Sequence, residues 1–227
     1  MNLLLLNPEE TGPDQAGPRE VTLQDRRAEH VVRILRAAVG DTLRCGVVDG
    51  PQGTATVVAV ESGPAPSVTL RADLTEPPVP AAHALLLAVP RPKVLQRLVA
   101  HAAALGFGEI VLVRTWTCDR AHVEAVQRRI EADQSSGLRP YEHELRAGLE
   151  QGRRTMLPEV RCEPLFKPFA EDRLGALWRD HTRWLAHPGA ESAAWAAGPS
   201  GAPLALALGP ERGFTGYEVE RLAEAGM

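Results

Sequence analysis

Short apolar runs separated by turn residues dominate the first third of the chain. The runs lie at residues 42–48, 53–60 and 67–71, and Asp-Gly-Pro and Ser-Gly-Pro turns separate them. Short strands at regular spacing, with turn signals between them, are typical of small β-barrels. The pattern therefore predicts a β-barrel domain over residues 1–72.

One helical pattern interrupts these predicted strands. Its apolar residues are Ala28, Val31, Val32 and Leu35, at the i, i+3, i+4, i+7 spacing of a single helix face. This spacing predicts a helix over residues 23–36.

A proline-rich stretch at residues 73–82 is followed by a change of period. Such a stretch is typical of a stiff linker, and we place the domain boundary there. Beyond it, continuous apolar runs alternate with helical patterns, which predicts an α/β domain with a mostly parallel sheet over residues 83–227. The expected strands are 84–89, 109–113, 159–162, 182–186 and 204–208, and the expected helices are 92–105, 121–134 and 141–152.

The composition is that of an ordinary globular protein, with 44% hydrophobic and 24% charged residues in a chain of 227. The formal net charge is −4, so nucleic-acid binding would require a local basic patch rather than an overall positive field. Arginine outnumbers lysine by 23 to 2. We interpret this excess mainly as a compositional bias of the genome, and only secondarily as a preference for bidentate phosphate contacts.

Cysteine usage indicates a reducing compartment. The 3 cysteines, Cys45, Cys118 and Cys162, are far apart and form no C-x-x-C pair, so neither a disulfide framework nor a structural zinc site is expected. The first apolar run, Leu3 to Leu6, is too short for a signal sequence, and no later run reaches the length of a membrane span. We therefore expect a cytoplasmic protein that binds no metal and no membrane.

The most informative segment joins an apolar strand to a Gly-Pro-x-x-Gly loop. Residues 204–208 form the strand and Gly209 to Gly213 the loop, after which Thr215 and Glu218 have the spacing of a helix capping box. Ligands of open α/β sheets bind beyond the carboxyl ends of strands, where small loop residues let backbone N–H groups approach them. The simpler interpretation is a tight strand-to-helix turn without a ligand. Neither a P-loop nor a Rossmann fingerprint is present.

With its neighbours, this segment resembles the closing motif of the ribosomal RNA uridine-N3 methyltransferases, the RsmE family of the SPOUT superfamily. The matching residues are Gly209-Pro210-Glu211, then Gly213-Phe214-Thr215, then Glu218-Val219. Further segments similar to family motifs follow in order along nearly the whole chain: 30–36 with 40–41, Lys93 with 104–107 and Ile110, 118–120, 150–154 with 157–160, and 186–189.

The resemblance implies a PUA-like β-barrel joined to a trefoil-knotted α/β methyltransferase domain. It implies a homodimer that uses S-adenosylmethionine to methylate N3 of one uridine in 16S ribosomal RNA of the small subunit. It points to no catalytic residue. The cofactor-binding residues that it implies are Ala186, His187, Pro188, Leu208, Gly209, Pro210, Glu211 and Gly213.

Basic side chains are the candidates for RNA contacts, since arginine grips phosphates and stabilises negative charge on a base. In the first domain the alternative is a solvated helix face paired with Asp25 and Glu29. The four tryptophans are expected as core or interface anchors rather than base-stacking platforms. The RNA-binding candidates are Arg26, Arg33, Arg36, Arg91, Lys93, Arg120, Arg153 and Arg154.

Two departures from the family pattern affect these expectations. The family continues into an L-G-x-R-I-L-R segment, whereas this chain ends at Met227, so an incomplete knot with weakened cofactor binding and dimerisation is expected. Arg212 stands where the family has glycine, which predicts backbone strain if that position is left-handed. Two other functions stay open: an RNA-binding protein of this fold with impaired cofactor binding, and an α/β enzyme whose Gly209 loop holds a small anionic substrate.

Overall fold

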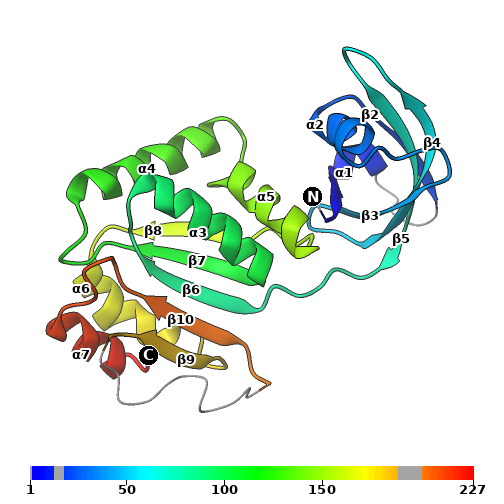
Figure 1. Ribbon diagram of the computed structural model, residues 1–227. Coiled ribbons are helices and arrows are strands. Elements are labelled where there is room, and N and C mark those ends of the chain that lie inside the picture. The colour runs from blue at the N-terminus through cyan, green and yellow to red at the C-terminus, as the bar shows by residue number, and fades with distance from the viewer. Residues whose placement is uncertain (1, 13–17, 189–200) are drawn as a thin grey trace. The chain divides into compact units, whose positions relative to one another are not determined.

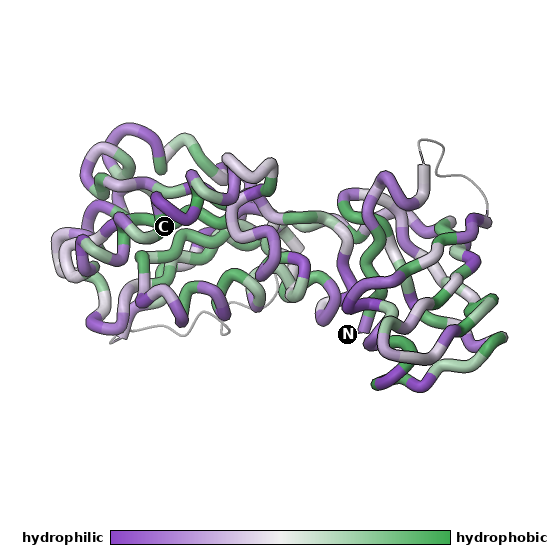
Figure 2. Tube along the Cα trace, turned by 90° about the horizontal axis from the view of Figure 1, so that it is seen from above, coloured by the Kyte–Doolittle hydropathy of each residue, from purple (hydrophilic) through white to green (hydrophobic). Residues whose placement is uncertain are grey.

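The computed structural model describes residues 2–12, 18–188 and 201–227 (Figure 1). The chain divides into two compact units. Unit 1 consists of Met1–Pro80 and Leu149–Leu157, and unit 2 of Ala81–Gly148 and Pro158–Met227. Hydrophobic and hydrophilic stretches alternate along the chain in both units (Figure 2).

Unit 1 is a curled five-stranded sheet in the order β1-β3-β4-β5-β2 (Figure 1). β1 pairs with β3 in parallel, and the other pairs are antiparallel. The side chains that alternate toward the inside of the curl form an entirely aliphatic core, apart from Cys45. The strands are β1 (Leu4–Leu6), β2 (Arg19–Leu23), β3 (Thr42–Val47), β4 (Gln52–Glu61) and β5 (Ser67–Glu76).

The predicted helix over residues 23–36 was wrong in its bounds and in its second half. Residues up to Leu23 belong to β2, and α2 (Arg26–Glu29) is capped by Asp25, which accepts a hydrogen bond from the Arg27 N–H at 2.8 Å. His30–Ile34 then form a π-helix. Because the wider π turn breaks the 3.6-residue period, Val31 stays buried while Leu35 is 47% exposed.

Unit 1 is completed by a segment from far along the sequence. The backbone N–H groups of Asn2 and Leu3 donate to the Glu150 carbonyl at 2.9 and 3.0 Å, and Thr155 donates its hydroxyl to the Gly50 carbonyl at 2.7 Å. A boundary at residues 73–82 was therefore incomplete in two respects: residues 73–76 belong to β5, and residues 149–157 belong to unit 1. The short helix α1 (Pro8–Thr11) was not predicted.

Unit 2 contains a five-stranded sheet in the order β8-β7-β6-β10-β9. All four strand pairs are parallel, which confirms the predicted α/β architecture. β6 is buried along nearly its whole length, as expected for a parallel strand covered on both faces. The strands are β6 (His83–Ala88), β7 (Phe107–Val113), β8 (Glu159–Glu163), β9 (Thr182–Ala186) and β10 (Leu204–Leu208).

Helices cover both faces of this sheet (Figure 1). Helix α3 ends as predicted at Gly106, which adopts the left-handed conformation with φ 90°. On the other face, Phe169 and Leu222 pack against Leu86 and Val111 of the strands. The helices are α3 (Pro92–Leu105), α4 (Arg120–Ser135), α5 (Glu142–Gly152), α6 (Phe166–Pro168) and α7 (Gly216–Glu224), with a π turn at Phe169–Arg173 and a 3-10 turn at Leu174–Ala176.

No helix in the described part of the chain is both long enough and apolar enough to cross a membrane. The same residues contain no cluster of three or more metal-ligating side chains.

Candidate functional site

The strand order of unit 2 creates a switch point between β6 and β10. From β6 the chain continues to β7 and β8 on one side, while β9 and β10 lie on the other side. In open parallel sheets, ligands bind in the crevice outside the carboxyl ends of the strands at such a point. The loops after Ala88 and Leu208 leave the sheet at this point.

The structure brings the predicted cofactor-binding loops together at this edge. Leu208 pairs with Ala186 of β9 on one side and with Leu87 of β6 on the other. The segments 186–188 and 209–213 therefore leave the sheet as neighbours. Nδ1 of His187 is buried and has no hydrogen-bond partner among the described residues. A buried, unpaired ring nitrogen at this position is suited to a polar ligand group.

The Gly209 loop is compact. The Gly213 N–H donates to the Pro210 carbonyl at 2.8 Å, which closes a tight turn. A Cβ atom at Gly209 would lie 3.1 Å from the ring of Phe214. Phe214 is buried in the core of unit 2, so it anchors the loop to the sheet.

The predicted strain at Arg212 was wrong. The left-handed residue of the loop is Gly213, with φ 75°, whereas Arg212 has a negative φ and an exposed side chain. The position in the turn that requires glycine is 213, not 212. Arg212 therefore fits the backbone without a conformational cost.

Replacing Gly213 by alanine is expected to destabilise unit 2 by about 1 kcal/mol, because an L-residue is strained at this φ although the space is open. Arg212→Ala is the matched control and should change stability by less than about 0.5 kcal/mol. Urea unfolding followed by tryptophan fluorescence measures both. Equal free energies of unfolding for the two variants would contradict the assignment of Gly213 as the left-handed residue of the loop.

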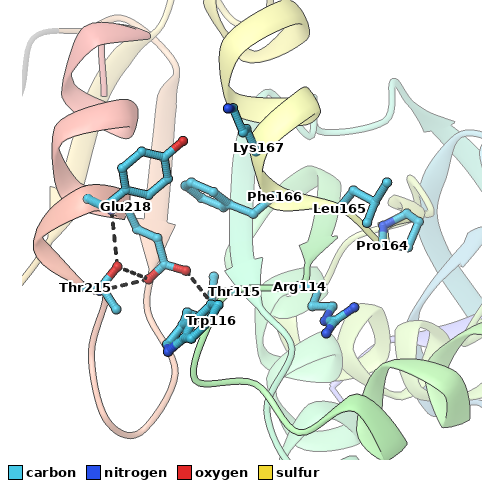
Figure 3. Close-up of a pocket in the computed structure, with 10 residues that line it drawn as sticks. Arg114, Thr115, Trp116, Pro164, Leu165, Phe166, Lys167, Thr215 and Glu218 are labelled. Atoms are coloured by element: carbon cyan, nitrogen blue, oxygen red, sulfur yellow. Dashed lines mark hydrogen bonds between the residues drawn. The ribbon is translucent and has the colours of Figure 1, made fainter.

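A buried carboxylate joins the loop after β7 to the start of α7. Glu218 accepts hydrogen bonds from the Trp116 N–H at 2.6 Å and from the Thr215 N–H at 2.8 Å (Figure 3). The Thr215 hydroxyl lies 3.0 Å from the same carboxylate, and its oxygen accepts from the Glu218 N–H. The predicted capping box is confirmed, and it also holds a second loop.

A pocket of about 840 Å³ opens beside this network (Figure 3). It lies beyond the carboxyl ends of β7 and β8, and the first turn of α7 forms one wall. None of the predicted cofactor-binding residues lines it. The lining residues are Arg114, Thr115, Trp116, Pro164, Leu165, Phe166, Lys167, Thr215, Tyr217 and Glu218.

The sequence did not indicate this pocket. Of the two expected roles for tryptophans, a place in the core does not hold for Trp116, which is 86% exposed. Trp178 and Trp184 are half-buried, and Trp195 lies outside the described residues. A sequence signal did exist, because Arg114 and Trp116 directly follow an apolar strand, but residue identity alone does not give exposure.

The basic candidates of unit 1 differ in their partners. Arg26 forms a bidentate pair with buried Glu150, at 2.6 and 3.1 Å. Arg33 pairs with Glu29. Arg154 donates to the Pro80 carbonyl at 3.2 Å. Two candidates are exposed and make no side-chain hydrogen bond or ion pair with any described residue: Arg36 and Arg153.

In unit 2 the basic candidates lie at helix starts on the carboxyl side of the sheet. Arg91 and Lys93 are exposed at the beginning of α3, directly after β6, and neither side chain has a polar partner among the described residues. Arg120, at the start of α4, pairs with Glu124 at 2.9 Å. Two charges without a polar partner among the described residues thus lie at the start of α3, on the β6 side of the switch point.

Cys45 and Cys162 offer no nucleophile to this site. Burial raises the pKa of Cys45 to about 12 and that of Cys162 to about 11, so both are neutral thiols near neutral pH.

These features define a protein of two units, one of which is an α/β domain with a candidate ligand site at the carboxyl edge of its parallel sheet. The sequence model of the RNA methyltransferase domain family matches residues 77–227. The chain therefore belongs to this family of RNA methyltransferases.

Similarity to individual proteins supports this family assignment. The chain is 26% identical over 230 residues to ribosomal RNA small subunit methyltransferase E of Treponema pallidum, covering 100% of this chain and 81% of the relative. The methyltransferase E of Neisseria gonorrhoeae, solved with bound S-adenosyl methionine, superposes with a TM-score of 0.65 at 17% identity, covering 100% of this chain and 86% of that one. A methyltransferase of Legionella pneumophila, solved with bound SAM, gives 0.63 at 22% identity, covering 99% and 86%. The resemblance to the RsmE family is confirmed.

Proposed function

We propose that this protein transfers a methyl group from S-adenosylmethionine to N3 of a uridine in 16S ribosomal RNA. The observation that carries the proposal is the convergence of segments 186–188 and 209–213 at the switch point of a sheet that belongs to an RNA methyltransferase family. In two structures of similar fold the methyltransferase holds S-adenosylmethionine.

The residues at this edge fit the cofactor. Gly209, Pro210 and Gly213 present backbone groups at this edge without bulky side chains, and Nδ1 of His187 is buried with no hydrogen-bond partner in the described part of the chain. We assign cofactor contacts to these residues together with Ala186, Pro188, Leu208 and Glu211. The cofactor would supply an electrophilic methyl group to a base that must lose its N3 proton.

We further propose that unit 1 is a PUA-like RNA-binding domain and that unit 2 is a SPOUT-type methyltransferase domain. The curled sheet and the exposed arginines of unit 1 support the first assignment. The all-parallel sheet with its switch point supports the second. A cytoplasmic homodimer acting on the small ribosomal subunit completes the proposal.

Calorimetric titration with S-adenosylmethionine, followed by methyl transfer to small ribosomal subunits, tests the function. Mass spectrometry of the digested RNA should identify N3-methyluridine. Transfer to another base or atom would contradict the proposed specificity. RNA binding without cofactor binding would instead identify an RNA-binding protein of this fold.

Arg36 provides a test of RNA binding that does not disturb folding. Its φ is 52°, so Arg36→Gly removes an exposed charge and suits the backbone. We expect weaker binding to a 16S RNA fragment and a salt dependence flatter by about 0.7–0.9 in log–log slope, as for one lost phosphate contact. Arg33→Gln, in which the lost side chain is already paired with Glu29, should change the slope less. Anisotropy titrations over a range of salt measure both, and equal slopes would refute the assignment.

A further inference from the structure

The pocket beside Glu218 is lined by both aromatic and basic side chains. Trp116 is 86% exposed and Tyr217 47%. The Tyr217 hydroxyl donates to Glu171 and the Arg221 guanidinium lies over its ring, so the open aromatic surface is that of Trp116. Arg114 and Lys167 also line the pocket, and neither side chain makes a hydrogen bond or ion pair with any other described residue. Figure 3 shows the two cations on different sides of the pocket.

The acidic group of the pocket is already engaged. Both oxygens of the Glu218 carboxylate accept hydrogen bonds, from the Trp116 N–H on one side and from Thr215 on the other. Glu218 is only 2% exposed, so it is hidden from a ligand in the pocket. The accessible charges of the lining are therefore positive.

Exposed aromatic rings together with uncompensated cations are the features that bind single-stranded nucleic acid. Every base can stack on an aromatic ring, and phosphates neutralise arginine and lysine. The methyl donor itself fits this lining poorly, because it carries a sulfonium and an ammonium against a single carboxylate, and two unpaired cations repel that excess positive charge.

The position of the pocket relates it to the proposed cofactor loop. Thr215 lines the pocket and lies two residues after Gly213, the last residue of that loop. Phe214, between them, is fixed in the core. A ligand in the pocket therefore lies next to the loop assigned to the methyl donor, as an acceptor must.

We propose that this pocket binds the unpaired RNA nucleotides at the methylation site, with a base stacked on Trp116 and phosphates held by Arg114 and Lys167. The proposal rests on the proposed function and names the part of the protein that receives the acceptor strand. A volume of about 840 Å³ is within the range of small-ligand pockets and accommodates more than one base.

The test measures the affinity of the full chain for single-stranded hexauridylate RNA by fluorescence anisotropy of a labelled oligonucleotide. Trp116→Ala should weaken binding about tenfold, since one stacked base is lost, while Trp116→Phe should stay within about threefold of the wild type. The double variant Arg114→Gln/Lys167→Gln should flatten the log–log salt slope by about 1.4, which corresponds to two phosphates of a single strand. A matched double variant, Arg128→Gln/Arg179→Gln, removes two exposed charges that do not line the pocket and should leave the affinity nearly unchanged.

Two parallel measurements separate this proposal from the function on which it rests. S-adenosylmethionine affinity should be the same in the wild type and in Trp116→Ala; a loss there would assign the pocket to the cofactor and overturn the proposal. Wild-type RNA affinity and wild-type kcat/KM for methyl transfer in Trp116→Ala would also overturn it, with the proposed function intact. A wild-type chain that shows no methyl transfer, but whose RNA affinity falls in Trp116→Ala, would contradict the function and support the RNA pocket.

Discussion

Glu218→Ala is expected to destabilise unit 2 by about 3 kcal/mol. The buried carboxylate accepts hydrogen bonds from two backbone N–H groups and lies within bonding distance of the Thr215 hydroxyl, at distances of 2.6 to 3.0 Å. Hydrogen bonds to a charged group contribute about 1.5–3 kcal/mol each, and the network is not additive. The variant also loses the capping box of α7 and releases the Trp116 loop from the helix.

Tryptophan fluorescence during urea unfolding measures this change, because all four tryptophans belong to unit 2. Glu218→Gln keeps one acceptor oxygen and should lose less than the alanine variant. Glu220→Ala is the control, since its side chain is 63% exposed on the same helix and should change stability by less than about 0.5 kcal/mol. Equal stability of the Glu218 and Glu220 variants would show that the carboxylate does not hold the loop.

Arg27→Met is expected to destabilise unit 1 by about 3 kcal/mol at neutral pH. The Arg27 side chain is 8% exposed and donates to Glu10, to Asp25 and to the Leu5 carbonyl. Removing one partner of a largely buried pair leaves the other without compensation. Methionine fills a similar volume, so the loss reports on the polar network rather than on a cavity.

The pH dependence of this loss has a definite sign. Burial opposes ionisation of Glu10 and Asp25, but hydrogen bonds and charge attraction from Arg27 outweigh it, and the pKa of each carboxyl lies below its ordinary value of 4.5 or 3.8. A lowered pKa in the folded state gives stability that is present above the ordinary value and disappears as pH falls through the folded-state value. The difference between wild type and Arg27→Met should therefore shrink as pH falls below about 4.

Far-UV circular dichroism and hydrogen exchange are the suitable probes here, since residues 1–80 and 149–157 contain no Phe, Trp or Tyr. Arg44→Gln is the control, because the Arg44–Glu76 pair is exposed on both sides. If the difference in free energy of unfolding between wild type and Arg27→Met stays constant from pH 7 to pH 3, stability is not linked to the ionisation of Glu10 and Asp25.

Local rules predicted most of unit 2. Gly106 ends α3 in the left-handed conformation and Thr215 caps α7, each as its residue type and spacing indicate. The prediction of one helix over residues 23–36 was wrong because His30–Ile34 form a π turn. The sequence there has helical spacing, but the π turn changes which side chains share a face. Trp116 was not expected to be exposed in the single chain because large apolar residues are buried on average, and an exposed one is visible only in the fold.

Contacts between distant residues could not be predicted in the same way. Arg26 was assigned to RNA because its neighbours in sequence are basic, yet its partner Glu150 lies 124 residues away. The pocket is assembled from the loops after β7 and β8 and the start of α7. A single sequence indicates where each loop lies along the chain, but not which loops come together to line one pocket.

The return of residues 149–157 to unit 1 has a consequence for synthesis on the ribosome. Thr155 and Glu150 supply partners to Gly50 and to Asn2, so the amino-terminal unit stays incomplete until much of unit 2 has been translated. The usual order, in which the first domain folds while the next is being made, is not available to this chain. An expression fragment that stops at residue 80 would leave the Gly50 carbonyl without its threonine hydroxyl and Arg26 without its buried carboxylate, and its sheet would be exposed where that segment belongs.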